Sequence, residues 1–178
     1  MEHAINLTLD VNGMPVTKLV EPRTHLIDFL RNDLGLTGSH AGCEHGVCGA
    51  CTVLVDGEIV RGCLTLACQL QGAEVQTVEG LTESGAIADL QTAFHQRNAL
   101  QCGYCTPGML VCATALLNEK PHASREEIRE YLSGNYCRCT GYEAIVDAIE
   151  TTAKNRAAGK ALGPTPRNAT GSSAKEAA

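Results

Sequence analysis

Apolar and polar residues alternate along the start of the chain. Over residues 4–11 an apolar side chain falls at every second position, which predicts a half-buried strand. The Asn-Gly pair at 12–13 predicts a hairpin turn, and residues 16–20 are the expected returning strand. The chain therefore begins with a predicted β-hairpin.

The spacing of apolar residues then becomes helical. Residues 24–34 predict a helix, and Thr24 is the expected N-terminal cap. A loop rich in glycine and cysteine follows over 35–51. An Asp-Gly pair centres a second predicted hairpin at 52–62, and residues 74–78 predict a last short strand. Residues 1–80 are thus expected to form a small mixed sheet crossed by one helix.

No strand pattern follows residue 80, and the remaining apolar spacing predicts four helices. They are expected at about 85–98, at 107–118, after a Ser124–Glu127 capping box, and at 141–154. The segment 107–118 is apolar nearly all round, so its helix should be buried. This pattern predicts a second, all-α domain over 81–155.

Small residues dominate the end of the chain. Residues 156–178 contain mostly Ala, Gly, Ser, Pro and Thr with few large apolar side chains, which predicts a flexible C-terminal tail.

Composition and charge narrow the function classes. The net charge is −6 and no basic run occurs, which argues against nucleic-acid binding. The chain has no apolar stretch of about 18 residues, so no membrane span is expected. Its start lacks the basic and apolar regions of a signal peptide, so a cytoplasmic location is expected.

Ten cysteines in 178 residues need an explanation. In a reducing compartment dense cysteines indicate metal or redox chemistry more often than disulfides. The positions fall in two groups with two remainders: Cys43, Cys48, Cys51 and Cys63; Cys102, Cys105, Cys137 and Cys139; and Cys68 and Cys112.

The first group has the spacing C-x4-C-x2-C followed by a more distant cysteine, which is typical of plant-type [2Fe–2S] clusters. Two bridged ferric ions need four converging thiolates, and this loop and the next hairpin supply them. Gly42, Gly46 and Gly49 allow left-handed backbone angles that bring N–H groups near the sulfurs. A structural zinc site is the alternative, although zinc sites more often pair two short cysteine hooks. Cys68 is a conceivable replacement for Cys63, and His40 and His45 are expected to be solvated.

The second group consists of two cysteine pairs, in CGYCTPG and CRCTG, that each precede a threonine. Thr106 with Pro107, and Thr140 with Glu143, predict helix starts directly after the cysteines. Two helix N-termini would then face the same ligand, and helix N-termini stabilise anions. A zinc site stays open for this group too. Cys112, inside the apolar helix, is expected to be a small buried hydrophobic residue.

Three longer motifs carry a family resemblance: GCEHGVCGACTVLVDG at 42–57, QCGYCTPGM at 101–109 and GNYCRCTGY at 134–142. Together they resemble the small iron–sulfur subunit of molybdenum hydroxylases, the enzymes like xanthine dehydrogenase, aldehyde oxidoreductase and carbon monoxide dehydrogenase. The resemblance covers residues 3–155. It implies an α+β fold in which a β-grasp, plant-type ferredoxin-like domain precedes an all-α four-helix bundle.

The resemblance also implies ligands and partners. The first cysteine group would hold a distal [2Fe–2S] cluster and the second a proximal one, with Gln101 and Cys139 close to the molybdopterin of a large partner subunit. Electrons would pass singly through both clusters to FAD on a medium subunit or to another acceptor. The chain has no nucleotide-binding fingerprint, so flavin is expected elsewhere. The substrate is expected to be an N-heteroaromatic compound, or alternatively an aldehyde.

Two other functions compete with this reading. One is a zinc-stabilised binding module without a redox role. The other is a stand-alone ferredoxin-like carrier, in which the helical domain and a second cluster would have no donor to face.

Overall fold

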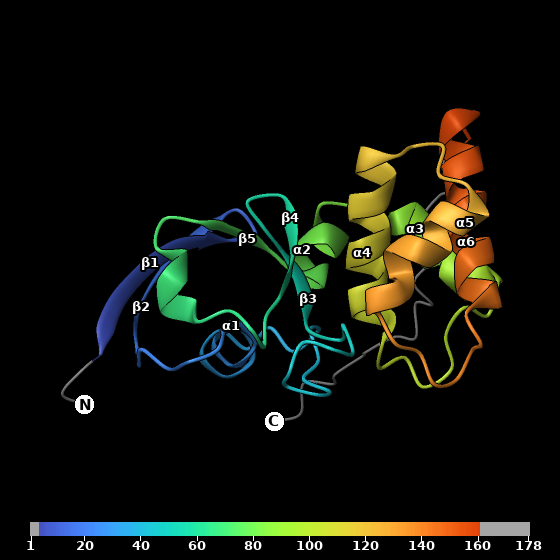
Figure 1. Cartoon of the computed structure of the whole chain (residues 1–178). Helices are drawn as coiled ribbons and strands as arrows, with labels where there is room; N and C mark the ends of the chain where they lie inside the picture. Colours follow the sequence, from blue (N-terminus) through green and yellow to red (C-terminus); the bar gives the residue numbers. More distant parts are fainter. Residues whose placement is uncertain (1–3, 161–178) are drawn as a thin grey trace, which may run out of the picture.

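The computed structural model describes residues 4–160, and its N-terminal half is a five-stranded mixed sheet (Figure 1). The strand order is β2-β1-β5-β3-β4, with β1 parallel to β5 and the other neighbours antiparallel. The bounds are β1 Ile5–Val11, β2 Met14–Val20, β3 Thr52–Val55, β4 Glu58–Arg61 and β5 Glu74–Gln76. The predicted sheet of two hairpins and a short strand is confirmed, and it fits a ferredoxin-like domain.

One short helix crosses this sheet, as predicted. Helix α1, Leu26–Asp28, continues into a π-helical turn at Phe29–Asp33. Leu26, Phe29 and Leu30 are fully buried and pack against the sheet core.

The predicted cap of this helix is wrong. His25, not Thr24, precedes the first helical residue, and no side chain caps it. The backbone N–H groups of Leu26 and Ile27 instead donate to the carbonyls of Thr65 (2.8 Å) and Gly62 (3.1 Å). A neighbouring backbone segment therefore satisfies the free N–H groups that a cap would otherwise satisfy.

The second half of the described chain is helical. Its predicted helices are found with shifted ends. One further helix was not predicted: the last strand, expected to reach residue 78, ends at Gln76, and a helix begins at Val78. The bounds are α2 Val78–Glu83, α3 Ala88–Gln96, α4 Thr106–Glu119, α5 Arg125–Tyr131 and α6 Glu143–Ala157, with short 3₁₀ turns at Ala67–Leu70 and Leu132–Gly134. Ser124 caps α5 in the predicted capping box, since its Oγ accepts from the Glu127 backbone N–H at 3.3 Å and its own N–H donates to the Glu127 carboxylate at 2.9 Å.

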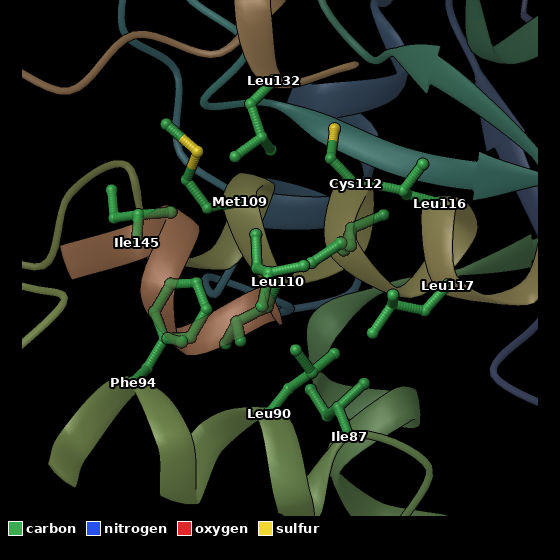
Figure 2. Close-up of a cluster of buried hydrophobic side chains, with 14 of the residues drawn as sticks. Ile87, Leu90, Phe94, Met109, Leu110, Cys112, Leu116, Leu117, Leu132 and Ile145 are labelled. Atoms are coloured by element: carbon green, nitrogen blue, oxygen red, sulfur yellow. The ribbon is translucent and has the colours of Figure 1, made fainter. Parts of the chain in front are cut away.

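Helix α4 joins the two halves. It lies beside β3 on one side and packs against α3 and α5 on the other (Figures 1 and 2). Leu90 and Phe94 of α3 point into the buried cluster that α3 shares with α4 and α6 in Figure 2, and both are at most 1% exposed. Burying each such side chain stabilises the fold by about 1.5–3 kcal/mol. The prediction that this apolar helix is buried is confirmed.

The C-terminal helix extends into the segment predicted as a tail. Helix α6 runs to Ala157, and Arg156 forms a two-pronged ion pair with Asp89 of α3, with N–O distances of 2.6 and 2.8 Å. The predicted tail start at 156 is therefore wrong by at least two residues, because a charged side chain can anchor a helix end that has few apolar residues. The rest of the predicted tail, 161–178, lies outside the described residues.

We expect the Arg156→Ala variant to lose about 1.5–3 kcal/mol of unfolding free energy, because a charge-assisted pair is broken and Asp89 is only 15% exposed. Burial alone would raise the pKa of Asp89, but the Arg156 guanidinium holds that pKa below its ordinary value. The pair therefore stabilises the protein fully above the ordinary carboxyl pKa and loses its contribution as the pH falls through the lowered value.

Urea unfolding at neutral and at acidic pH checks this prediction. The matched control is Lys154→Ala, since Lys154 is 71% exposed and, among residues 4–160, its ion pair is with Glu150. Equal losses for the two variants at neutral pH would contradict the role given to Arg156.

No helix within residues 4–160 combines the length and apolar character needed to cross a bilayer.

Candidate metal centres

The first two cysteines of the first group meet within one tight loop. The backbone N–H of Cys48 points at the Sγ of Cys43 at 3.3 Å, and the two thiols also contact each other. The N–H groups of Cys48 and His45 lower the pKa of Cys43 to about 6. Gly46 and Gly49 have the predicted left-handed conformation, but the prediction is wrong for Gly42, whose φ is not positive. The loop is thus arranged to stabilise a thiolate.

Cys51 and Cys63 form the other pair of the first group. Cys51 immediately precedes β3, and Cys63 follows β4 by two residues, so the hairpin sets them opposite each other. The backbone N–H of Gly62 donates to the Cys51 carbonyl at 3.1 Å. The two thiols contact each other, are 2% and 3% exposed, and pack with Ile27 of α1. Burial raises the pKa of Cys51 to about 11, so its thiolate needs a bound cation.

The second group also meets as two pairs. The Sγ atoms of Cys102 and Cys139 are 3.5 Å apart, and both residues are exposed. The side-chain amide of Gln101 donates to the Cys139 carbonyl at 3.0 Å. The structure therefore brings together Gln101 and Cys139, the two residues that the resemblance associates with the pterin.

Cys105 and Cys137 form the inner pair of this group. Burial, followed by the neighbouring Cys137, raises the pKa of Cys105 to about 12. Burial alone would raise the pKa of Cys137. The Thr140 hydroxyl, whose Oγ1 lies 3.1 Å from the sulfur, helps to lower that pKa below its ordinary value. The Tyr142 hydroxyl accepts from the Cys137 backbone N–H at 2.9 Å.

Paired sulfurs suit a [2Fe–2S] cluster, in which each iron takes two thiolates from the protein. A structural zinc ion instead draws four ligands to one point. In the described part of the chain no three His, Cys, Asp or Glu side chains are grouped around a single-ion position. The donor set and its pairing therefore fit two-iron clusters, which supply one-electron redox chemistry when bound.

The predicted helix caps beside the second group are wrong. Cys105 itself caps α4, Pro107 lies in the first turn as predicted, and the Oγ1 of Thr106 has no hydrogen-bond partner among the described residues. Helix α6 begins only at Glu143 and is capped by Tyr142 with a φ of 68°. Only the N-terminus of α4 directly adjoins a candidate ligand.

The hydroxyl of Thr140 explains the difference at α6. It accepts from the Tyr142 backbone N–H at 3.2 Å and contacts the sulfur of Cys137, while Glu143 pairs with Arg125 and Arg129. Neither member of the predicted capping box therefore serves as a cap.

The two cysteine groups border one hollow. It measures about 300 Å³ and is lined by residues of both groups and their neighbours: Gly42, Cys43, Cys48, Ala50, Cys102, Tyr104, Cys105, Tyr136, Cys137, Arg138 and Cys139. A backbone hydrogen bond from Tyr136 to the Cys48 carbonyl, at 2.8 Å, joins the two loops directly. No local pattern in the sequence predicts this contact.

His40 is not the solvated residue that was expected. Its ring stacks on Tyr104 with centroids 4.4 Å apart, and its Nδ1 donates to the Tyr104 carbonyl at 2.8 Å. The Tyr104 hydroxyl donates in turn to the Ala41 carbonyl at 2.7 Å. This is a second connection between the two cysteine loops. His45 is exposed, but its Nδ1 contacts the Cys43 carbonyl.

The two remaining cysteines lie away from the paired sulfurs. The thiol of Cys68 donates to the Pro22 carbonyl at 3.3 Å, so Cys63 and not Cys68 is placed beside Cys51. Cys112 is buried as expected, but it is not purely a hydrophobic residue, because its thiol donates to Asn135 at 3.2 Å.

Comparison with protein families defines the class. The family model described as "2Fe-2S iron-sulfur cluster binding domain" matches residues 9–82, and the one described as "[2Fe-2S] binding domain" matches residues 77–150. The chain is thus an iron–sulfur protein with two [2Fe–2S] binding domains.

Similarity to individual proteins narrows the class further. The chain is 52% identical over 152 residues to the caffeine dehydrogenase subunit gamma of Pseudomonas sp. (strain CBB1), covering 84% of this chain and 90% of that one. It is 54% identical over 145 residues to the nicotine 6-hydroxylase small subunit of Paenarthrobacter nicotinovorans, covering 82% and 87%. A chain in the crystal structure of quinoline 2-oxidoreductase from Pseudomonas putida 86 superimposes with a TM-score of 0.82 at 49% identity, covering 89% and 99%.

The chain therefore belongs to the family of small iron–sulfur subunits of molybdenum hydroxylases, and its role is electron transfer within an oxidoreductase.

Proposed function

We propose that the first cysteine group holds the distal [2Fe–2S] cluster and that the second group holds the proximal one. The observation that carries this proposal is the pairing of the sulfurs: Cys43 with Cys48, Cys51 with Cys63, Cys102 with Cys139, and Cys105 with Cys137. Each pair would bind one iron of its cluster. The clusters would accept and release single electrons, while the protein holds them and sets their electrostatic surroundings.

The exposed side of the second group is the proposed contact with a large molybdopterin-binding subunit. Cys102, Cys139 and Gln101 are all exposed there, whereas Cys51 and Cys63 of the first group are buried. Gln101 would hold the Cys139 backbone in place through its amide and would meet the pterin from the same side.

A medium subunit that binds FAD is the proposed next acceptor of electrons. The chain itself has no nucleotide-binding fingerprint, and its curated relatives are named as subunits of larger enzymes. The named substrates of the similar proteins, caffeine, nicotine and quinoline, are N-heteroaromatic compounds. We therefore assign an N-heteroaromatic substrate to the complex, ahead of an aldehyde.

The finer organisation is also a proposal. A boundary near residue 80 would separate the ferredoxin-like domain from the domain of the second cluster, and α3, α4, α5 and α6 would form the four-helix bundle of the latter. The ranges matched by the two family models, 9–82 and 77–150, support this division.

The test is anaerobic visible absorbance of the complex purified natively through a tag on this chain. N-heteroaromatic compounds and aldehydes are added one at a time, and dithionite is added last. Bleaching by an N-heteroaromatic compound is the expected result, accompanied by molybdenum and flavin in the same preparation. A chain that purifies alone with bleachable clusters would indicate a stand-alone carrier, and bleaching by aldehydes only would overturn the substrate class.

The Gln101→Ala variant is expected to keep both clusters and to be reduced more slowly by substrate, or to retain less molybdenum, because the Cys139 backbone loses its amide partner. The matched control is Gln96→Ala, since Gln96 is an exposed residue at the end of α3. Stopped-flow reduction and molybdenum analysis measure the effect. Unchanged kinetics together with unchanged molybdenum content would refute the pterin contact.

A further inference from the structure

Arg61, at the end of β4, reaches from the sheet domain into the helical domain. Its Nη1 donates to Thr52 Oγ1 of β3, and its Nη2 donates to the Gly134 carbonyl at 2.8 Å and to Asn135 Oδ1 at 3.1 Å. The planar guanidinium thus holds one acceptor in the first domain and two in the second. A planar fork of this kind fixes direction as well as distance.

Asn135 extends this connection back toward the first cysteine group. It is 2% exposed, and its side-chain amide donates to the Gly49 carbonyl at 3.2 Å while its Oδ1 accepts from Arg61 and from the Cys112 thiol. Thr52 Oγ1 also donates to the Gly49 carbonyl, at 2.6 Å. Thr52 and Asn135, which both accept from Arg61, therefore hold the same carbonyl, that of the residue after Cys48, from the two domains.

The chains approach each other closely at this point. A methyl group on Gly49 would lie 2.5 Å from the Gly134 carbonyl oxygen, and one on Gly108 would lie 2.4 Å from the Gly49 oxygen. The hydrogen bond from Tyr136 N–H to the Cys48 carbonyl lies next to this contact. It connects a residue of the first cysteine group with the residue that precedes Cys137.

The side chain of Arg61 has no acidic partner within 4 Å among residues 4–160. Its hydrogen bonds go to carbonyl, hydroxyl and amide oxygens, and the Cys112 thiol also lies against its guanidinium. The position of the Arg61 side chain is therefore not explained by an ion pair. It is explained by the acceptors that the two loops present.

We propose that Arg61 is the positioning residue that fixes the two cluster sites relative to each other, acting through Asn135 and the Gly49 peptide on the Cys48–Tyr136 hydrogen bond. This inference rests on the proposed function, because it takes each cysteine group as a cluster site. When the sites are filled, their separation and the bonds between them govern how readily an electron crosses. Loss of the fork would let the two loops move apart while each keeps its own four cysteines.

The experiment compares Arg61→Gln and Arg61→Lys in the natively purified complex with Arg23→Gln as the control. Arg23 is an 88% exposed arginine that, in the described part of the chain, pairs with the nearby Glu21. Iron and labile sulfide are measured first, and EPR spectra of the fully reduced complex then report the magnetic interaction between the two clusters. Lysine keeps the charge but has no planar fork, so it separates positioning from charge alone.

The expected result is normal iron and sulfide content in all variants, with the interaction splitting lost or reduced for both Arg61 variants and unchanged for Arg23→Gln. An unchanged splitting in Arg61→Gln with both clusters present would overturn the inference and leave the proposed function intact. A splitting that changes in Arg61→Gln but is retained in Arg61→Lys would also overturn it, because the charge alone would then suffice. If wild-type protein contained no iron, the proposed function itself would fail. If Arg61→Gln does not fold, the interaction splitting is compared in Arg61→Lys and in Thr52→Val. The Thr52→Val change removes the acceptor hydroxyl at almost constant volume.

Discussion

The Cys48→Ser variant should lose one of two EPR signals on reduction and keep the other. The Cys48 sulfur contacts Cys43 in the first group, and serine, whose hydroxyl is far less acidic than a thiol, is a poor replacement for a thiolate ligand. The contact with the second group uses the Cys48 backbone carbonyl, which serine retains. The second cluster should therefore survive.

The matched control is Cys68→Ser, because Cys68 is a half-buried cysteine whose thiol donates to the Pro22 carbonyl, away from both cysteine groups. It should keep both signals. EPR of dithionite-reduced protein with iron analysis provides the measurement. Loss of both signals in Cys48→Ser, or of neither, would contradict two independent cluster sites.

The Gly49→Ala variant should be the most damaging single methyl addition at the junction. Gly49 has a φ of 74°, and its added methyl group would lie 2.5 Å from the Gly134 carbonyl oxygen, which belongs to backbone and cannot easily move. The left-handed angle costs about 1–2 kcal/mol and the overpacking about 1–3 kcal/mol, so a loss of about 2–5 kcal/mol in unfolding free energy is expected. The strain should also alter the magnetic interaction between the clusters.

Gly57→Ala separates these two contributions. Gly57 has a similar φ of 86° in the β3–β4 turn, but no atom lies within 4 Å of an added methyl group. Urea unfolding should show a loss of about 1–2 kcal/mol for this variant, from the backbone angle alone. Equal losses for the two variants would mean that the close approach of the two loops does not constrain Gly49.

The elements that the sequence predicts well are those with strong local patterns. Alternating apolar residues and the Asn-Gly and Asp-Gly turns predict both hairpins, and the apolar run at 107–118 predicts a buried helix that the structure places between the two halves. The Ser124 capping box is also local and is confirmed. The cysteine spacings likewise predict two groups whose sulfurs the structure pairs.

The caps fail where tertiary contacts compete for the same side chains. Thr24 is replaced as a cap by the backbone carbonyls of Gly62 and Thr65, and Thr140 turns its hydroxyl to Cys137 and Tyr142. The tail boundary fails for a similar reason, because Arg156 is anchored by a distant carboxylate. Such partners lie far apart in the sequence and leave no local signal.

The contacts that join the two cysteine groups are the hardest part of the structure to predict from the sequence. Arg61 lies 73 residues from Gly134 and 74 from Asn135, and no spacing rule links them. What the sequence does contain is three glycines, Gly49, Gly108 and Gly134, whose missing side chains allow the close approach. Their meaning becomes clear only when the two domains are packed together.

Metal and sulfide analysis of anaerobically purified protein tests most directly whether this chain carries two [2Fe–2S] clusters. Two irons in each of two matched domains predict four irons and four labile sulfides per chain, with two distinguishable EPR signals after reduction. Colourless protein that contains stoichiometric zinc and no labile sulfide would contradict the account.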